Sequence, residues 1–231
     1  MNPKDRLIVA LDVDSRDRAL RLVDELRRHV GMFKIGKELF TSEGPEIVRE
    51  VVGSGGRVFL DLKFHDIPNT VAKAVGAASR LGAFFATIHA SGGRDMMEAA
   101  ASAIPAEGTR LLGITVLTSH TDETLRETGA GSGVAETVRR LAVLARNSGL
   151  DGVVCSPHEI PLIREEVGDD LLIVTPGIRP AGAARGDQAR VTTPRDALRL
   201  GCDYIVVGRP IIEAASPKDA ADAIVEDLSR G

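Results

Sequence analysis

The sequence predicts an α/β protein, a single-domain (β/α)8 TIM barrel that covers residues 1–231. Three observations lead to this fold class. Short apolar runs recur eight times, an amphipathic helical pattern follows each of them, and no linker or shift in composition divides the chain. Eight strand–helix pairs in 231 residues agree with the usual size of such a barrel, about 250 residues.

The eight apolar runs are rich in Val, Ile, Leu and Phe and show little polar alternation. This composition is typical of parallel strands that are covered on both faces, as all strands of a closed barrel are. In chain order the predicted strands are LIVALDV at 7–13, MFKIG at 32–36, RVFLDLK at 57–63, AFFATIHA at 83–90, RLLGITVLT at 110–118, GVVCS at 152–156, LLIVTPG at 171–177 and YIVVG at 204–208.

Helical patterns fill the intervals between these strands. Residues 16–30, for example, place Leu20, Val23 and Leu26 on one apolar stripe, with charged residues elsewhere. Several patterns carry a proline suited to the first turn or a glycine where the helix should stop. The predicted helices cover residues 16–30, 43–53, 68–81, 93–104, 134–148, 157–167, 194–200 and 217–229.

A doubly wound sheet is the competing fold, and it would place a glycine-rich phosphate turn after the first strand. This chain has Asp-Val-Asp-Ser at 12–15 instead. The glycine cluster at 129–133 lacks the last glycine of G-x-G-x-x-G, because position 134 is Val, and it follows a polar stretch. We therefore interpret 129–133 as a flexible loop and favour the barrel.

The composition excludes several classes of function. Twenty-nine Lys and Arg against 33 Asp and Glu give a net charge of -4, which offers no general attraction to nucleic acid or anionic membrane. No apolar stretch approaches the roughly 18 residues of a membrane span, and the first run is too short for a signal peptide. Cys155 and Cys202 form no C-x-x-C pair. We expect a cytoplasmic protein with reduced, buried thiols and no nucleic-acid or membrane partner.

Charged residues gather at the predicted strand ends, where barrels of this kind carry their active sites. The first three strands end near Asp12, Lys34 and the Asp61/Lys63 pair, and Asp66 lies just beyond. Ionisable side chains inside apolar strands are costly unless they are paired. Their alternating sign at one rim therefore predicts a functional site.

The segment DLKFHDIPNT at 61–70 is the most specific part of this rim. Asp61 and Lys63 are two residues apart on a strand, so both side chains should face the barrel mouth and stabilise each other's charged form. Lys63 would then be a proton donor, whereas Asp66 lies past the strand and can point elsewhere. The alternative is an ion pair that merely closes the rim, and the nearby Asp12 and Lys34 argue against it.

A second constellation follows the last two strands, where barrels commonly bind phosphate. The segments VTPGIRP at 174–180 and VVGRP at 206–210 supply Arg179 and Arg209, each able to bind two phosphate oxygens, and Gln188 offers a neutral donor. The alternative is a pair of surface arginines in ordinary ion pairs.

Metal ligation has weaker support. The five histidines show no metal-ligand spacing, and a lone strand-end histidine such as His89 is more often a packing residue. Asp12, Asp61 and Asp66 could bind Mg²⁺, but Lys34 and Lys63 at the same rim would compete with the ion. We predict no metal and no cofactor.

The motif Asp61-x-Lys63-x-x-Asp66-Ile-Pro-Asn-Thr70 is similar to the signature of the orotidine 5′-phosphate decarboxylase family. The resemblance extends along essentially the whole chain. It also takes in LDVD at 11–14, FKIGKELF at 33–40, IHASGG at 88–93, TVLTS at 115–119, TPGIRP at 175–180, DQARVTTP at 187–194 and VGRPI at 207–211.

The resemblance implies a homodimeric barrel that converts orotidine 5′-monophosphate to UMP and CO2, the last step of de novo UMP synthesis, without metal or cofactor. It implies a catalytic array in which Asp66 reaches into the partner's site, and mobile loops at 119–133 and 178–193. The catalytic residues would be Lys34, Asp61, Lys63 and Asp66. The substrate-binding residues would be Asp12, Lys34 and Asp61, with Ile67 and Thr70 of the motif, Thr118 near the pyrimidine, and Arg179, Gln188, Gly208 and Arg209 at the phosphate.

Two other functions remain open as alternatives. Mg²⁺-dependent sugar-phosphate decarboxylases and aldolases resemble this group in the D-x-K-x-x-D motif, but they place a carboxylate where this chain has Lys34. A non-catalytic nucleotide-binding barrel would tolerate the loss of Lys63 or Asp61, and both are present. These residues favour the decarboxylase.

Overall fold

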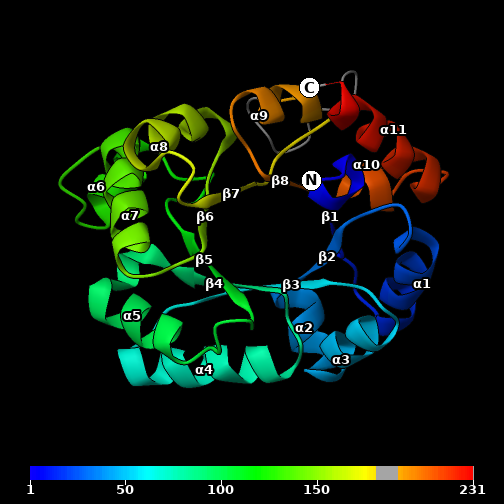
Figure 1. The fold of residues 1–231 in the computed structure, drawn as a ribbon, viewed down its shortest axis with the longest axis horizontal. Helices are drawn as coiled ribbons and strands as arrows, with labels where there is room; N and C mark the ends of the chain where they lie inside the picture. The colour runs from blue at the N-terminus through cyan, green and yellow to red at the C-terminus, as the bar shows by residue number, and fades with distance from the viewer. Residues whose placement is uncertain (181–191, 231) are drawn as a thin grey trace.

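A computed structural model describes residues 1–180 and 192–230 of the chain. Eight parallel strands form a closed barrel in sequence order (Figure 1), which confirms the predicted (β/α)8 TIM barrel. The strands are β1 Leu7–Ala10, β2 Met32–Gly36, β3 Val58–Phe64, β4 Phe85–His89, β5 Arg110–Ile114, β6 Gly152–Val154, β7 Leu172–Thr175 and β8 Tyr204–Val207. Pairing of β1 with β8, with Ile8 opposite Val206, closes the ring.

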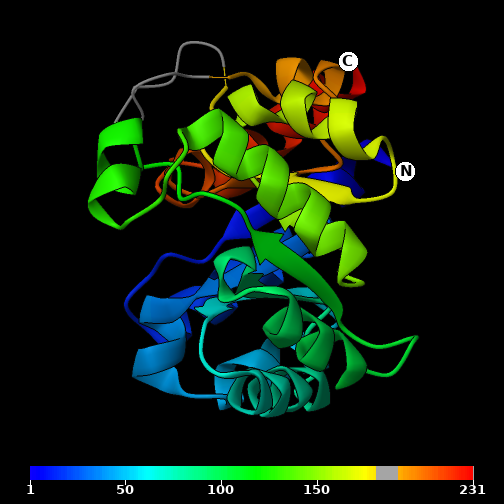
Figure 2. The same cartoon turned by 90° about the vertical axis from the view of Figure 1, so that its left-hand side faces the viewer.

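Helices surround the barrel, and α4 packs against α5, as both views show (Figures 1 and 2). The α-helices are α1 Arg16–Leu26, α2 Lys37–Glu43, α3 Glu46–Gly53, α4 Pro68–Arg80, α5 Arg94–Ser102, α6 Asp122–Glu127, α7 Val134–Asn147, α8 Ile160–Val167, α9 Pro194–Arg199, α10 Arg209–Ile212 and α11 Pro217–Ser229. Short 3-10 helices are η1 Pro3–Arg6, η2 Ala90–Gly92 and η3 Pro157–Glu159.

The structure shortens several predicted elements. The first strand ends at Ala10 and not at residue 13, and the fifth ends at Ile114 and not at 118. Leu11, Val13 and Val116 lie beyond these ends and stay buried although they have left the ladder, so hydrophobicity alone overestimates strand length. Helices α2, α6 and α10 were not predicted, because each spans no more than seven residues, too few to show a helical period. Residues 128–133 connect α6 to α7 without helix or strand, in agreement with the predicted loop.

The inside of the barrel is filled by apolar side chains. The ring of Phe85 makes edge-to-face contacts with Phe59 and Tyr204, at centroid distances of 5.9 and 5.2 Å. Phe59 and Val206 belong to this interior cluster and also line a cavity toward the carboxyl ends of the strands. The interior core therefore forms the floor of that cavity.

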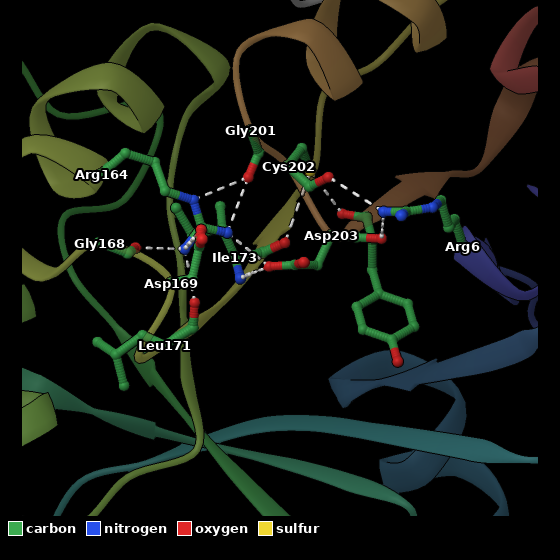
Figure 3. A network of polar contacts seen from close by, with 10 residues as sticks. Arg6, Arg164, Gly168, Asp169, Leu171, Ile173, Gly201, Cys202 and Asp203 are labelled. Carbon is green, nitrogen blue, oxygen red and sulfur yellow. Dashed lines mark hydrogen bonds and ion pairs between the residues drawn. The ribbon is translucent and has the colours of Figure 1, made fainter. Parts of the chain in front are cut away.

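A polar network fixes the opposite end of the barrel, where β7 and β8 begin (Figure 3). The guanidinium of Arg164, on α8, donates to the carbonyl oxygens of Gly168, Leu171 and Gly201 and to the carboxylate of Asp203. Asp203 Oδ2 also accepts from the backbone N–H of Ile173, at 2.8 Å. One arginine thus joins α8 to the segments that lead into two neighbouring strands.

Within the described part of the chain, no helix has the length and apolar character needed to cross a membrane. Both cysteines are free and buried, as predicted. Burial raises the pKa of the Cys202 thiol to about 12 and raises that of Cys155 well above its usual value.

Candidate active site

A cavity of about 270 Å³ opens at the carboxyl ends of the strands. Its charged lining residues are Lys34, Asp61 and Lys63, and most of the others are apolar. A larger hollow of about 820 Å³ lies near the amino ends of β5 and β7, around Arg110 and Leu172. We place the site in the smaller cavity, because it contains the paired charges and lies where barrel enzymes bind their substrates.

The shortest charge contact in the cavity joins Lys63 Nζ to Asp61 Oδ2, at 2.7 Å. The side chains are only 24% and 12% exposed, so bulk water screens the pair weakly. Such a contact keeps the ammonium in a fixed place at the cavity wall. The predicted Asp61–Lys63 pair is therefore present.

The backbone of β3 is irregular where it carries this pair. Leu60 lies opposite Ala86 of β4 while Phe64 lies opposite Ile88, so β3 holds two extra residues between these points. Lys63 has φ of 54°, and it is the one non-glycine residue with positive φ in the described chain. Simple strand alternation, on which the prediction relied, thus does not account for the contact. A local bulge brings the two side chains together, and such distortions are common beside active sites.

A second ion pair lies beside the first. Lys34 of β2 donates to Asp12 Oδ1 at 3.0 Å, and Asp12 follows the end of β1. The Lys34 side chain is 13% exposed and that of Asp12 is 54% exposed, so the lysine is held in the cavity by a carboxylate at its mouth. The structure thus brings four of the predicted rim charges together in two contacts.

Two glycines lie against the Asp12–Lys34 pair, and sequence reasoning missed one of them, Gly36. A Cβ atom at Gly36 would lie 3.1 Å from Lys34 Nζ, and one at Gly208 would lie 3.5 Å from Asp12 Oδ2. Gly208 had been assigned to phosphate binding, whereas Gly36 had no assigned role. Its position at the end of an apolar strand was the available signal.

Sequence reasoning also missed Thr87, the third residue of β4. Its side chain is fully buried and its Oγ1 atom lies 3.0 Å from Asp61 Oδ1 and 2.9 Å from the backbone nitrogen of Lys63. A threonine between apolar neighbours in the run AFFATIHA was the signal that could have indicated it.

The rest of the D-x-K-x-x-D-I-P-N-T motif lies outside the cavity. Asp66, Ile67 and Thr70 are exposed, and none of them lines the 270 Å³ cavity. Asp66 Oδ1 accepts from the backbone N–H of Ile67 at 2.6 Å, and the Ile67 residue is 67% exposed. Within one chain, these three residues do not join the Asp61–Lys63 pair.

The predicted phosphate-binding residues lie at two neighbouring strand ends. Arg179 follows β7, is 9% exposed, and has an Nε atom without a hydrogen-bond partner in the described structure. Its backbone N–H donates to Thr192 O at 3.1 Å. Gly208 directly follows β8, and the next residue, Arg209, is exposed and is the first residue of α10. Gln188 lies outside the described residues.

Two other polar side chains considered from the sequence are Thr118 and His89. Thr118 lines the cavity from the segment that follows β5, and it is exposed. His89, at the end of β4, is half-buried and packs on the ring of His65, with 5.4 Å between centroids. Burial lowers the pKa of His89, and the nearby His65, Lys37 and Lys63 lower it further.

In the described residues, no three His, Cys, Asp or Glu side chains gather in a way that could hold a metal ion.

The fold and these contacts define a barrel enzyme with a lysine–carboxylate site at the carboxyl ends of its strands. The chain belongs to the orotidine 5′-phosphate decarboxylase / HUMPS family, whose model matches residues 5–224.

Individual relatives agree with this family. The orotidine 5′-phosphate decarboxylase of Pelobacter propionicus is 55% identical over 230 residues, which cover 98% of this chain and 96% of the relative. The orotidine 5′-phosphate decarboxylase of Moorella thermoacetica is 52% identical over 236 residues, which cover 99% of this chain and 94% of the relative. The crystal structure of orotidine 5′-phosphate decarboxylase from Lactobacillus acidophilus superposes with a TM-score of 0.86 at 41% identity, covering 96% of this chain and 98% of the other.

Proposed function

We propose that this protein decarboxylates orotidine 5′-monophosphate to UMP and CO2, the last step of de novo UMP synthesis. The observation that carries the proposal is the Lys63 ammonium, which Asp61 fixes at 2.7 Å in the wall of the cavity. The family of the chain and the names of its relatives support the same activity. Lys34, Asp61 and Lys63 line one cavity of a single closed barrel, and on this ground we propose that residues 1–231 act as one catalytic domain.

The chemistry requires a cation beside the reacting carbon. When CO2 leaves C6 of the pyrimidine, the bonding electron pair stays on C6 as a vinyl carbanion with no adjacent electron sink. The Lys63 ammonium stabilises this charge and then transfers its proton to C6. The resulting neutral amine regains a proton from solvent before the next turnover. Because Asp61 fixes the ammonium in advance, little reorganisation is needed when the charge develops.

Asp61 has a second proposed effect on the substrate. Its carboxylate would lie near the carboxylate that is lost, and like charges disfavour the bound substrate more than the transition state. Asp12 and Lys34 would bind the ribose, and Thr118 would contact the pyrimidine. The phosphate would be held by Arg179, Gln188, Gly208 and Arg209. It is far from C6, but the energy gained by binding it can contribute to the chemical step.

We also propose a cytoplasmic homodimer in which Asp66 completes the partner's site. Its support within the chain is that Asp66 is exposed and lies outside the cavity of its own chain. Mixing a Lys63→Ala chain with an Asp66→Ala chain tests this, because mixed dimers would regain one intact site. No recovery of activity after demonstrated subunit exchange would refute the arrangement.

The alternative function within the same family group is a Mg²⁺-dependent reaction on a sugar phosphate. The contact of Lys34 with Asp12 disfavours it, because a cation occupies the place where a metal-binding carboxylate would be needed. We propose that the enzyme works without a metal or an organic cofactor.

One assay tests the function. The purified protein is mixed with orotidine 5′-monophosphate in excess EDTA, and the ultraviolet change to UMP is followed for wild type, Lys63→Ala and the control Lys218→Ala. Lys218 is an exposed lysine of α11 that does not line the cavity. We expect rapid conversion by wild type and the control, and loss of conversion with Lys63→Ala. No conversion by folded wild-type protein would refute the proposal and direct attention to Mg²⁺ and sugar phosphates.

A further inference from the structure

Thr87 is a buried polar residue that joins both members of the Asp61–Lys63 pair. The backbone nitrogen of Lys63 can only donate, so Thr87 Oγ1 is the acceptor of the 2.9 Å contact. The hydroxyl hydrogen remains available, and it is donated to Asp61 Oδ1 at 3.0 Å. The chemistry of the groups therefore determines the direction of both hydrogen bonds.

The Thr87 hydroxyl accepts a hydrogen bond that, in a regular sheet, a backbone carbonyl oxygen would accept. Thr87 lies opposite the bulge of β3, between the pairs Leu60–Ala86 and Phe64–Ile88. With two extra residues in β3, the Lys63 N–H donates to a side chain of β4. Lys63 also has a left-handed backbone, a conformation that is unfavourable for a residue other than glycine. The bond from Lys63 to Thr87 helps to stabilise this backbone.

The same hydroxyl limits the freedom of the Asp61 carboxylate. Oδ1 accepts from Thr87 and Oδ2 accepts from Lys63 Nζ, so both oxygens are engaged and the carboxylate plane is fixed. The Asp61 side chain is only 12% exposed, which leaves little water to replace a lost partner. Without the Thr87 hydroxyl, Asp61 Oδ1 would lose this hydrogen-bond donor, and the carboxylate could turn away from Lys63.

We propose that Thr87 is a positioning residue, which sets the place of the Lys63 ammonium through the carboxylate of Asp61 and through the Lys63 backbone. The inference rests on the proposed decarboxylation, in which the position of that ammonium relative to C6 limits the rate. Thr87 does not line the cavity, so it acts through its two partners and not on the substrate.

Three substitutions separate the hydroxyl from the shape of the side chain. Thr87→Val keeps the branched shape and removes both hydrogen bonds, whereas Thr87→Ser keeps the hydroxyl. Thr109→Val is the matched control, because Thr109 is a buried threonine whose Oγ1 donates to Ala83 O at 2.6 Å near the amino end of β5. It removes a comparable hydrogen bond far from the cavity.

The experiment measures kcat and KM for orotidine 5′-monophosphate at equal amounts of folded protein. A displacement of about 1 Å in a catalytic group lowers rates by up to roughly 100-fold, so we expect kcat of Thr87→Val to fall about 10- to 100-fold. KM should change much less, Thr87→Ser should retain most of the activity, and Thr109→Val should match wild type. If Thr87→Val does not fold, Thr87→Ala is measured in its place with the same expectation.

Two kinetic results would overturn the inference. One is a kcat of the valine variant close to that of wild type, and the other is a serine variant as impaired as the valine variant. A crystal structure of Thr87→Val provides a readout that does not need activity, because the contact of Lys63 with Asp61 should lengthen or break. If wild type fails to decarboxylate the substrate, the proposed function fails, and an unchanged contact in the crystal would separately refute the role of Thr87.

Discussion

Replacing Arg164 with alanine should destabilise the protein strongly and leave its chemistry intact. The guanidinium donates Nε and Nη2 to Gly201 O at 3.0 and 2.8 Å, and Nη1 to Gly168 O and Leu171 O at 2.8 Å each. Nη2 also lies 2.7 Å from Asp203 Oδ2, and the Arg164 side chain is 17% exposed. All of these partners belong to segments at the amino ends of β7 and β8 (Figure 3), away from the cavity.

The size of the effect follows from these contacts. A hydrogen bond that involves a charged group contributes about 1.5–3 kcal/mol, but several bonds from one side chain do not add fully. Removing Arg164 also leaves the Asp203 carboxylate, which is only 27% exposed, without the positive charge that offsets the cost of its burial. We estimate a loss of about 3–5 kcal/mol for Arg164→Ala. At about 2–4 °C per kcal/mol for a chain of this size, Tm should fall by about 6–20 °C.

The assay combines urea and thermal unfolding with kcat measured well below the transition. Arg164→Lys should recover only part of the loss, because an ammonium cannot reach four acceptors as a planar guanidinium does. Arg139→Ala is the control, since the exposed ion pairs of Arg139 with Glu165 and Glu166 contribute about 0–1 kcal/mol. A loss below about 1 kcal/mol for Arg164→Ala would contradict the reasoning. So would a large fall in kcat of the folded variant, because it would connect this network to the site.

Three further predictions concern the rim and the core. Gly36→Ala should lower kcat/KM several-fold with little loss of stability, because its Cβ would lie 3.1 Å from Lys34 Nζ and the ammonium would have to shift slightly. Kinetics at matched Tm check this, and unchanged kcat/KM would refute it. The pKa of His89 is lowered in the folded protein, so as the pH falls this histidine is protonated in the unfolded chain before it is protonated in the folded one. The free energy of unfolding should therefore fall as the pH drops below about 6.5. Urea unfolding of His89→Gln should show a weaker pH dependence in this range, and an equal slope would exclude His89 as the cause. The buried Cys155, with its raised pKa, should not react with a disulfide reagent at pH 8 until the protein unfolds, and a fast reaction of the native protein would contradict its burial.

The barrel could be predicted from the sequence because its signals are local. Each apolar run and each amphipathic stretch is visible within about ten residues, and the alternation of strand and helix admits few topologies. Element ends were less accurate, since residues such as Leu11 and Val116 stay buried after the ladder has ended. Short helices such as α10 carry no period that a sequence pattern can show.

The candidate site was predictable in its charged residues for a related reason. All strands of a parallel barrel present their carboxyl ends at one rim, so charges at separate strand ends, such as Lys34 and Asp61, must come near one another. The assigned roles of Arg179, Gln188 and the segment around Asp66 remain predictions.

By itself, the sequence determined where along the chain the eight strands lie and which charged side chains stand at the rim. Only the tertiary structure decided how these side chains meet. The bulge in β3, the left-handed backbone of Lys63 and the two hydrogen bonds of Thr87 depend on the register between β3 and β4. Register and close packing join residues that are more than twenty positions apart, and a pattern of polar and apolar residues along the chain does not encode distances of that kind.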